Sequence, residues 1–161
     1  MKRRRVYLIG LLVLLAAIAV ATGAAAGDQD ELAQVRAATA QFHDPQVAEG
    51  AGWGLVPGLD HCFENPGTGA MGYHYINTDW LDGAVEITRP ESLVYAPGAD
   101  GKLKLAAVEY IVPAGNGAPS PLFGQSFHLN EELGVYVLHA WIWRNNPAGI
   151  FEDWNPRVSC P

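Results

Sequence analysis

The stretch LKLAAVEYIV at residues 103–112 has the apolar, β-branched and aromatic composition that is typical of a strand inside a sheet. Successive side chains of a strand point to opposite faces, so one face is expected to carry Leu103, Leu105, Ala107, Glu109 and Ile111. Glu109 is the charged member of this otherwise apolar face. An ionised carboxylate in such surroundings needs a paired charge or a bound cation. The stretch therefore predicts a core strand that carries a buried carboxylate.

Four further segments show strand patterns bounded by turn residues, and they are 72–77, 92–95, 126–129 and 135–143. The turn PGADG at residues 97–101 predicts a hairpin between the strands at 92–95 and 103–112. A second turn at residues 130–134 joins the last two segments. Strands joined by tight turns are antiparallel, so the sequence predicts a curled antiparallel sheet.

A helix is expected before the strands. Leu32, Val35, Thr39 and Phe42 recur every three or four residues, as on one face of a helix. Asp44-Pro45 ends this helix and begins a short second one. The apolar face of the helix has to be buried against the sheet. We therefore predict an α+β fold in a single globular domain over residues 27–161, with the N-terminal helix packed on the curled sheet.

Residues 1–26 have the three parts of a secretory signal peptide. Met1–Arg5 is basic, residues 6–20 are apolar and uncharged, and residues 24–26 are alanines that a signal peptidase recognises. We predict a signal peptide over 1–26 that is cleaved after Ala26. The alternative is an uncleaved anchor, because the apolar stretch approaches the roughly 20 residues that span a bilayer. Both alternatives predict an exported protein, secreted or extracytoplasmic, that contacts the membrane only through an uncleaved N-terminal segment.

The remaining chain is strongly acidic. It keeps six of the ten basic residues and all 17 acidic ones, so its net charge is −11. Such a surface repels phosphate backbones and anionic lipid headgroups. Nucleic acids and membrane surfaces are therefore not expected as partners. The predicted partner is a metal ion or a small ligand, on the strength of the residues described below.

Two cysteines, Cys62 and Cys160, fit the predicted export. Disulfides persist in oxidising compartments outside the cytoplasm, so an even pair in an exported chain predicts one disulfide. The alternative is a pair of free buried thiols. A thiolate metal site is disfavoured, because the sequence has no CxxC spacing.

Histidines interrupt two other strand faces. In the last strand His139 shares a face with Val135, Val137, Trp141 and Trp143, and in the first strand His74 shares a face with Gly72 and Ile76. If the strands bring His74, His139 and Glu109 together, they form a two-histidine, one-carboxylate set suited to Zn, Cu, Fe or Mn. His128 or His43 could complete the set, and Met71 is a candidate soft ligand for copper.

Structural roles are the alternative for the same residues. Glu109 could pair with Arg144, Arg157 or His139 inside the core, and buried histidines are often hydrogen-bonded core residues. No HExxH sequence, phosphate loop or GxSxG elbow is present, so no catalytic residue is assigned and binding is favoured over turnover. Tryptophans at positions 53, 80, 141, 143 and 154 suggest a second alternative, a noncatalytic secreted or envelope module that binds glycans.

Five segments carry a resemblance to other proteins. They are VRAATAQFHD (35–44), GAMGYHYIN (69–77), RPESLVYAPGADGKLKLAAVEYIVP (89–113), PLFGQSF (121–127) and LHAWIWRNNPAGIFEDWNPRVSCP (138–161). These segments resemble a family of exported bacterial proteins that has no assigned activity. The resemblance covers nearly the whole chain after residue 26. It implies export, and it implies no metal, substrate or catalytic residue.

Overall fold

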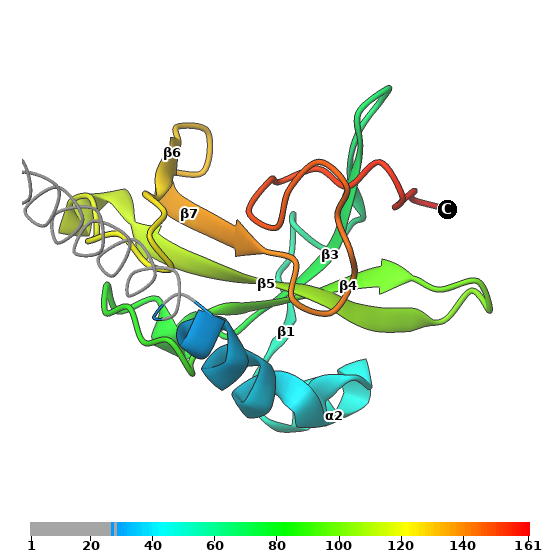
Figure 1. Ribbon diagram of the computed structural model, residues 1–161, viewed down its shortest axis with the longest axis horizontal. Helices are drawn as coiled ribbons and strands as arrows, with labels where there is room; N and C mark the ends of the chain where they lie inside the picture. Colours follow the sequence, from blue (N-terminus) through cyan, green and yellow to red (C-terminus); the bar gives the residue numbers. More distant parts are fainter. Residues whose placement is uncertain (1–26, 28) are drawn as a thin grey trace, which may run out of the picture.

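A computed structural model of the chain describes residue 27 and residues 29–161 (Figure 1). The predicted signal peptide, residues 1–26, lies outside these residues. The described chain contains helical segments followed by a seven-stranded antiparallel sheet, so the predicted α+β class is confirmed.

The helical segments come first in the described chain. Residues 29–39 are helical and lead into the 3-10 helix η1 (Ala40–Phe42). The short helix α2 (Pro45–Gly50) follows, and the Asp44 carboxylate accepts a hydrogen bond from the Gln46 amide at its start. This cap and the proline at the first helical position begin α2 where the sequence predicts.

Seven strands make up the sheet, and they are β1 (Gly54–Leu55), β2 (Phe63–Asn65), β3 (Gly69–Ile76), β4 (Ser92–Pro97), β5 (Leu103–Pro113), β6 (His128–Asn130) and β7 (Val135–Ala140). Their order across the open sheet is β1-β3-β4-β5-β7-β6, and β1 and β2 pair with opposite ends of β3. The 3-10 helices η2 (Thr78–Trp80) and η3 (Ala114–Asn116) lie in the connections. β4 and β5 form a long twisted hairpin, closed by the predicted turn at 97–101 (Figure 1).

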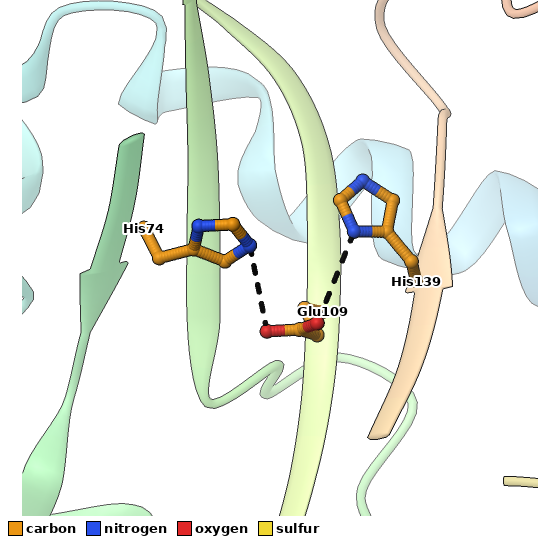
Figure 2. A group of neighbouring side chains, drawn as sticks. All are labelled: His74, Glu109 and His139. Atoms are coloured by element: carbon orange, nitrogen blue, oxygen red, sulfur yellow. Dashed lines mark ion pairs between the residues drawn. The ribbon is translucent and has the colours of Figure 1, made fainter. Parts of the chain in front are cut away.

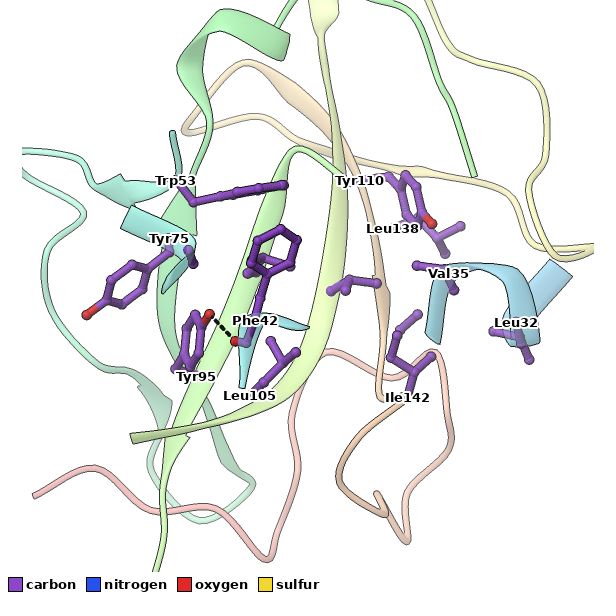
Figure 3. Packing of buried hydrophobic residues seen from close by; sticks show 14 of the residues in the cluster. Leu32, Val35, Phe42, Trp53, Tyr75, Tyr95, Leu105, Tyr110, Leu138 and Ile142 are labelled. Atoms are coloured by element: carbon purple, nitrogen blue, oxygen red, sulfur yellow. Dashed lines mark hydrogen bonds between the residues drawn. The ribbon is translucent and has the colours of Figure 1, made fainter. Parts of the chain in front are cut away.

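One face of the sheet packs against the helices (Figure 3). Leu32 and Val35 from the first helix are buried in the same cluster as residues of β4, β5 and β7. The Tyr95 hydroxyl donates to the Phe42 carbonyl at 2.6 Å, which joins β4 to η1. Burial of each large aliphatic side chain contributes about 1.5–3 kcal/mol, so this face supplies most of the apolar stabilisation.

The other face of the sheet is covered by the C-terminal segment, which is orange to red in Figure 1. A smaller cluster on this face contains Val94, Ala107, Trp141 and Val158. The predicted disulfide between Cys62 and Cys160 is confirmed, with a Cα–Cα distance of 5.7 Å across a sequence separation of 98. The segment also pairs with β3, because Asn155 and Ala70 exchange two backbone hydrogen bonds.

A β-bulge in β5 corrects the predicted faces of that strand. Val94 pairs with Ala107 and Tyr95 pairs with Leu105, so β5 contains one extra residue, Ala106. Leu105, like Leu103, consequently packs in the cluster on the helix side, whereas Ala107 lies on the opposite face. The prediction of one shared face for residues 103–111 is therefore wrong at Leu103 and Leu105.

The bulge is linked to the early end of β7. This strand ends at Ala140, not at the predicted Trp143: the Trp141 amide bonds to the Ile150 carbonyl at 2.8 Å, and the Trp143 and Arg144 amides both bond to the Ala106 carbonyl at 3.0 Å. Trp141 stays on the predicted face, in the cluster under the C-terminal segment. The Trp143 side chain lies on the helix side instead, where its indole donates to the Thr39 hydroxyl at 3.1 Å.

We predict that Gly72→Ala destabilises the protein much more than Gly58→Ala. Both glycines have positive φ, +113° and +87°, but an added Cβ clashes with the Tyr95 carbonyl only at Gly72 and meets open space at Gly58. The backbone strain alone should lower the free energy of unfolding by about 1 kcal/mol, and the clash should raise the total loss to about 3 kcal/mol. Urea denaturation of both variants measures the difference. Equal losses would show that β3 and β4 are not this close.

Candidate metal centre

Three strands bring His74, Glu109 and His139 together. They come from β3, β5 and β7, and the register pairs Glu109 directly with His139. Paired residues of neighbouring strands project from the same face, so both side chains lie on the face under the C-terminal segment. Figure 2 shows the carboxylate between the two imidazole rings, which approach it from either side. The predicted grouping of these three residues is therefore present in the structure.

The distances between the facing atoms of the three residues are close to those between the ligand atoms of a metal site. His74 Nε2 is 3.6 Å from Glu109 Oε2, and His139 Nδ1 is 3.9 Å from Glu109 Oε1. One ligand atom from each residue lies within 4.8 Å of the other two. Ligand atoms around tetrahedral zinc are about 3.4 Å apart, so a slight contraction of the group would enclose an ion. The 3.9 Å separation is too long for a hydrogen bond, which leaves Glu109 without a direct bond to His139.

Burial sets the charge state of the group. His74 is 5% exposed, Glu109 is 8% exposed and His139 is fully buried. Desolvation lowers the pKa of His74 and outweighs the opposing attraction of Glu109, so this imidazole is neutral at pH 7. Burial raises the pKa of Glu109, but attraction to the protonated forms of His74 and His139 is stronger and holds the pKa of this carboxyl below its usual range. The charge of Glu109 therefore depends on a positive charge beside it, which a protonated imidazole or a bound cation would supply.

No lysine or arginine pairs with Glu109 within the described part of the chain. The ion pairs of Glu109 are those with the two histidines. Of the alternative partners, His139 lies beside Glu109, whereas the two arginines bond elsewhere: Arg144 donates to the Pro97 and Arg157 carbonyls, and Arg157 donates to Asn145 Oδ1. A buried carboxylate without a full positive charge nearby is costly, and a bound cation removes that cost.

Several polar atoms of the site are buried without a hydrogen-bond partner in the described chain. They are His74 Nδ1, both ring nitrogens of His139 and the Ser92 hydroxyl. Ser92 pairs with Glu109 in the β4–β5 register, so its side chain lies on the same face. Sequence analysis missed Ser92, although its place at the start of a predicted strand opposite Glu109 is the feature that could have indicated it. Buried polar groups nearly always have partners, so this group is typical of a ligand site.

The other predicted ligands lie outside the group. His128 is exposed on edge strand β6, and its Nε2 is 3.4 Å from Asp153 Oδ2. His43 packs edge-on against Trp143, with ring centroids 4.4 Å apart, beside the helix-side cluster. β6 pairs with β7, but the His128 imidazole lies beside Asp153 and outside the three-residue group, and His43 lies on the helix side of the sheet. They are therefore not brought to Glu109.

A cavity of about 210 Å³ lies against the site. His74 and Glu109 line it together with Met71, and most of its other lining residues are aliphatic. Sequence analysis did not predict this cavity, because loop residues such as Leu59 and Leu133 complete its wall. Met71 therefore borders the site without belonging to the three-residue group.

The tryptophans have structural positions. Trp53 and Trp141 are buried, and Trp80, Trp143 and Trp154 are half-buried. Two of the indoles donate to backbone carbonyls, Trp53 to Pro90 and Trp141 to Glu152. Stacking on sugar rings requires exposed aromatic faces, so these positions give the glycan alternative no support.

No protein-family model matches the chain, and no curated protein or solved structure matches it. The resemblance to exported bacterial proteins therefore stays a prediction. Among the described helices, none has the length and apolar character needed to cross a bilayer.

A second buried carboxylate, Glu91, precedes β4. Glu91 is fully buried, its Oε2 accepts the Ile111 amide at 2.9 Å, and its Oε1 has no partner. Burial raises the pKa of Glu91 to about 7. Glu91 precedes the predicted strand at 92–95, so strand alternation assigned it to no face.

We predict that Glu91→Gln removes a pH dependence of stability. The unfolded chain releases this proton near pH 4.5 and the folded protein near pH 7, so the stabilisation is present at low pH and lost as the pH rises through 7. Relative to wild type, the variant should gain roughly 3 kcal/mol in the free energy of unfolding between pH 4 and pH 8. Urea denaturation across this range measures the gain, with Glu132→Gln at an exposed position as the control. A constant difference between Glu91→Gln and wild type would refute the prediction.

Proposed function

We propose that this is an exported binding protein that holds one divalent transition metal ion through His74, Glu109 and His139. The observation that carries the proposal is a buried carboxylate between two imidazoles, with no lysine or arginine paired to it in the described chain. Imidazole nitrogens with one carboxylate oxygen suit Zn, Cu, Fe or Mn, whereas Ca²⁺ and Mg²⁺ prefer oxygen ligands alone.

The facing atoms define how each residue would bind the ion. His74 would use Nε2 and His139 would use Nδ1, because these nitrogens face the Glu109 oxygens. The protons of the two neutral rings would then lie on His74 Nδ1 and His139 Nε2. Ring tautomers that are fixed in this way are usual for histidine ligands.

Binding or storage is proposed instead of turnover. The sequence contains none of the catalytic signatures considered above, and the three ligands are almost completely enclosed. Export is supported by the signal-peptide pattern of residues 1–26 and by the disulfide, which is typical of oxidising compartments. The proposed cofactor is the bound metal ion itself.

We predict that the full chain, prepared without chelators or metal-affinity resin, binds one Zn²⁺ per molecule in calorimetric titration. Glu109→Gln keeps the size of the side chain but removes its charge. Changes around a metal ligand already weaken binding by roughly 10- to 100-fold, so loss of this ligand should weaken it at least a hundredfold. Zn²⁺ should also stabilise the wild type, by about 2.7 kcal/mol at a hundred times the dissociation constant.

The matched control is Glu91→Gln, which changes a buried carboxylate outside the group. It should bind Zn²⁺ as the wild type does. If Glu109 has only a structural role, Glu109→Gln will change the free energy of unfolding while the wild type takes up no metal. Wild-type protein that binds none of Zn²⁺, Cu²⁺, Fe²⁺ and Mn²⁺ would rule out the proposal.

A further inference from the structure

The cavity beside the site has a polar floor and apolar walls. His74 and Glu109 line it, and both are less than a tenth exposed. The neighbouring wall residues Ile111 and Val137 are buried, whereas Leu133 at the rim is 47% exposed. The cavity therefore leads from the surface down to the proposed metal ligands.

The size of the cavity suits a small organic molecule. Its volume is about 210 Å³, and an apolar cavity of about 150 Å³ is known to hold benzene. The additional volume provides room for one head group beside an aromatic ring. A larger ligand would have to extend past Leu133 into solvent.

The net charge of the metal-loaded site determines which head group a ligand in the cavity should carry. Glu109 is the charged side chain of the cavity lining, so a divalent ion bound there leaves one positive charge. Two imidazoles and one carboxylate also leave a fourth position on a tetrahedral ion. His139 does not line the cavity, so the open position faces the side where His74 and Glu109 meet it. An uncompensated charge in an apolar cavity is unfavourable, and a singly charged anionic donor at this position removes it.

We propose, on the basis of the metal-binding function above, that the metal-loaded site binds a small monoanion with an apolar body. The carboxylate or thiolate head completes the coordination of the metal, and the aromatic or branched aliphatic body fills the cavity. The protein would thus be a metal-dependent carrier or receptor for such anions.

The experiment uses three probes, two of them matched in shape, on the full chain with and without Zn²⁺. Para-toluate has both the anionic head and the apolar ring, para-toluamide has the ring without the charge, and acetate has the head without the ring. Calorimetry should show that para-toluate binds the zinc-loaded protein at least about tenfold more tightly than either of the others. Its binding should be lost when zinc is removed.

Two variants test the location of the probe. Val135→Phe reduces the cavity from a wall position four residues from His139, and it should weaken para-toluate at least tenfold while Zn²⁺ affinity is unchanged. Val47→Phe, at an exposed position of α2, is the control and should change neither affinity. Leu81→Phe makes the same test from a different wall if Val135→Phe does not fold.

The outcomes separate the two proposals. Zinc binding without para-toluate binding, or with equal affinity for acetate, overturns the anion proposal and leaves the metal site intact. Equal binding of para-toluate to zinc-free protein also overturns it, because the metal then has no part in recognition. Failure of the wild type to bind zinc or any of the other three ions overturns both proposals.

Discussion

The buried charge of Glu109 is the constraint on which the site depends. A carboxylate that is 8% exposed loses most of its hydration, which costs several kcal/mol unless other charges replace the water. The described chain offers it two imidazoles at 3.6 and 3.9 Å and no paired lysine or arginine. A neutral His74 beside this anion makes a poor ion pair but a good pair of metal ligands. This arrangement is therefore unfavourable without a bound ion, and it favours the binding of a cation.

The larger apolar cluster and the candidate metal site lie on opposite faces of the sheet. The helix side carries the larger cluster, joined to η1 by the Tyr95 hydrogen bond, and it holds the strands in register. That register places Glu109 opposite His139 on the other face. There the C-terminal segment, fixed by the Cys62–Cys160 disulfide, covers part of the face on which these residues lie. Electrostatic interactions are stronger between buried side chains, as His74, Glu109 and His139 are.

Much of the fold could be predicted from the sequence. Strand alternation was sufficient to select His74, Glu109 and His139, because polar residues on apolar faces stand out without any knowledge of strand order. Two features depended on contacts between distant segments. The bulge at Ala106 shifts the β4–β5 register and so reverses the face of Leu105, and the Ala106 carbonyl accepts the Trp143 amide beyond the end of β7. The short strands β1 and β2 contain only two and three residues, too few for a periodic pattern, and β2 contributes Phe63 to the cavity wall.

The burial of Glu91 could not be predicted from the sequence either, because the residues that surround it are brought there by the fold and are not its neighbours in the chain. For the metal site itself, the most direct measurement is X-ray absorption at the zinc K-edge of the loaded wild-type protein. Coordination by His74, Glu109 and His139 predicts two imidazole nitrogens and at least one oxygen at about 2.0–2.2 Å, with the multiple-scattering pattern of histidine rings. A spectrum with oxygen ligands alone, or with a single imidazole, would contradict this coordination.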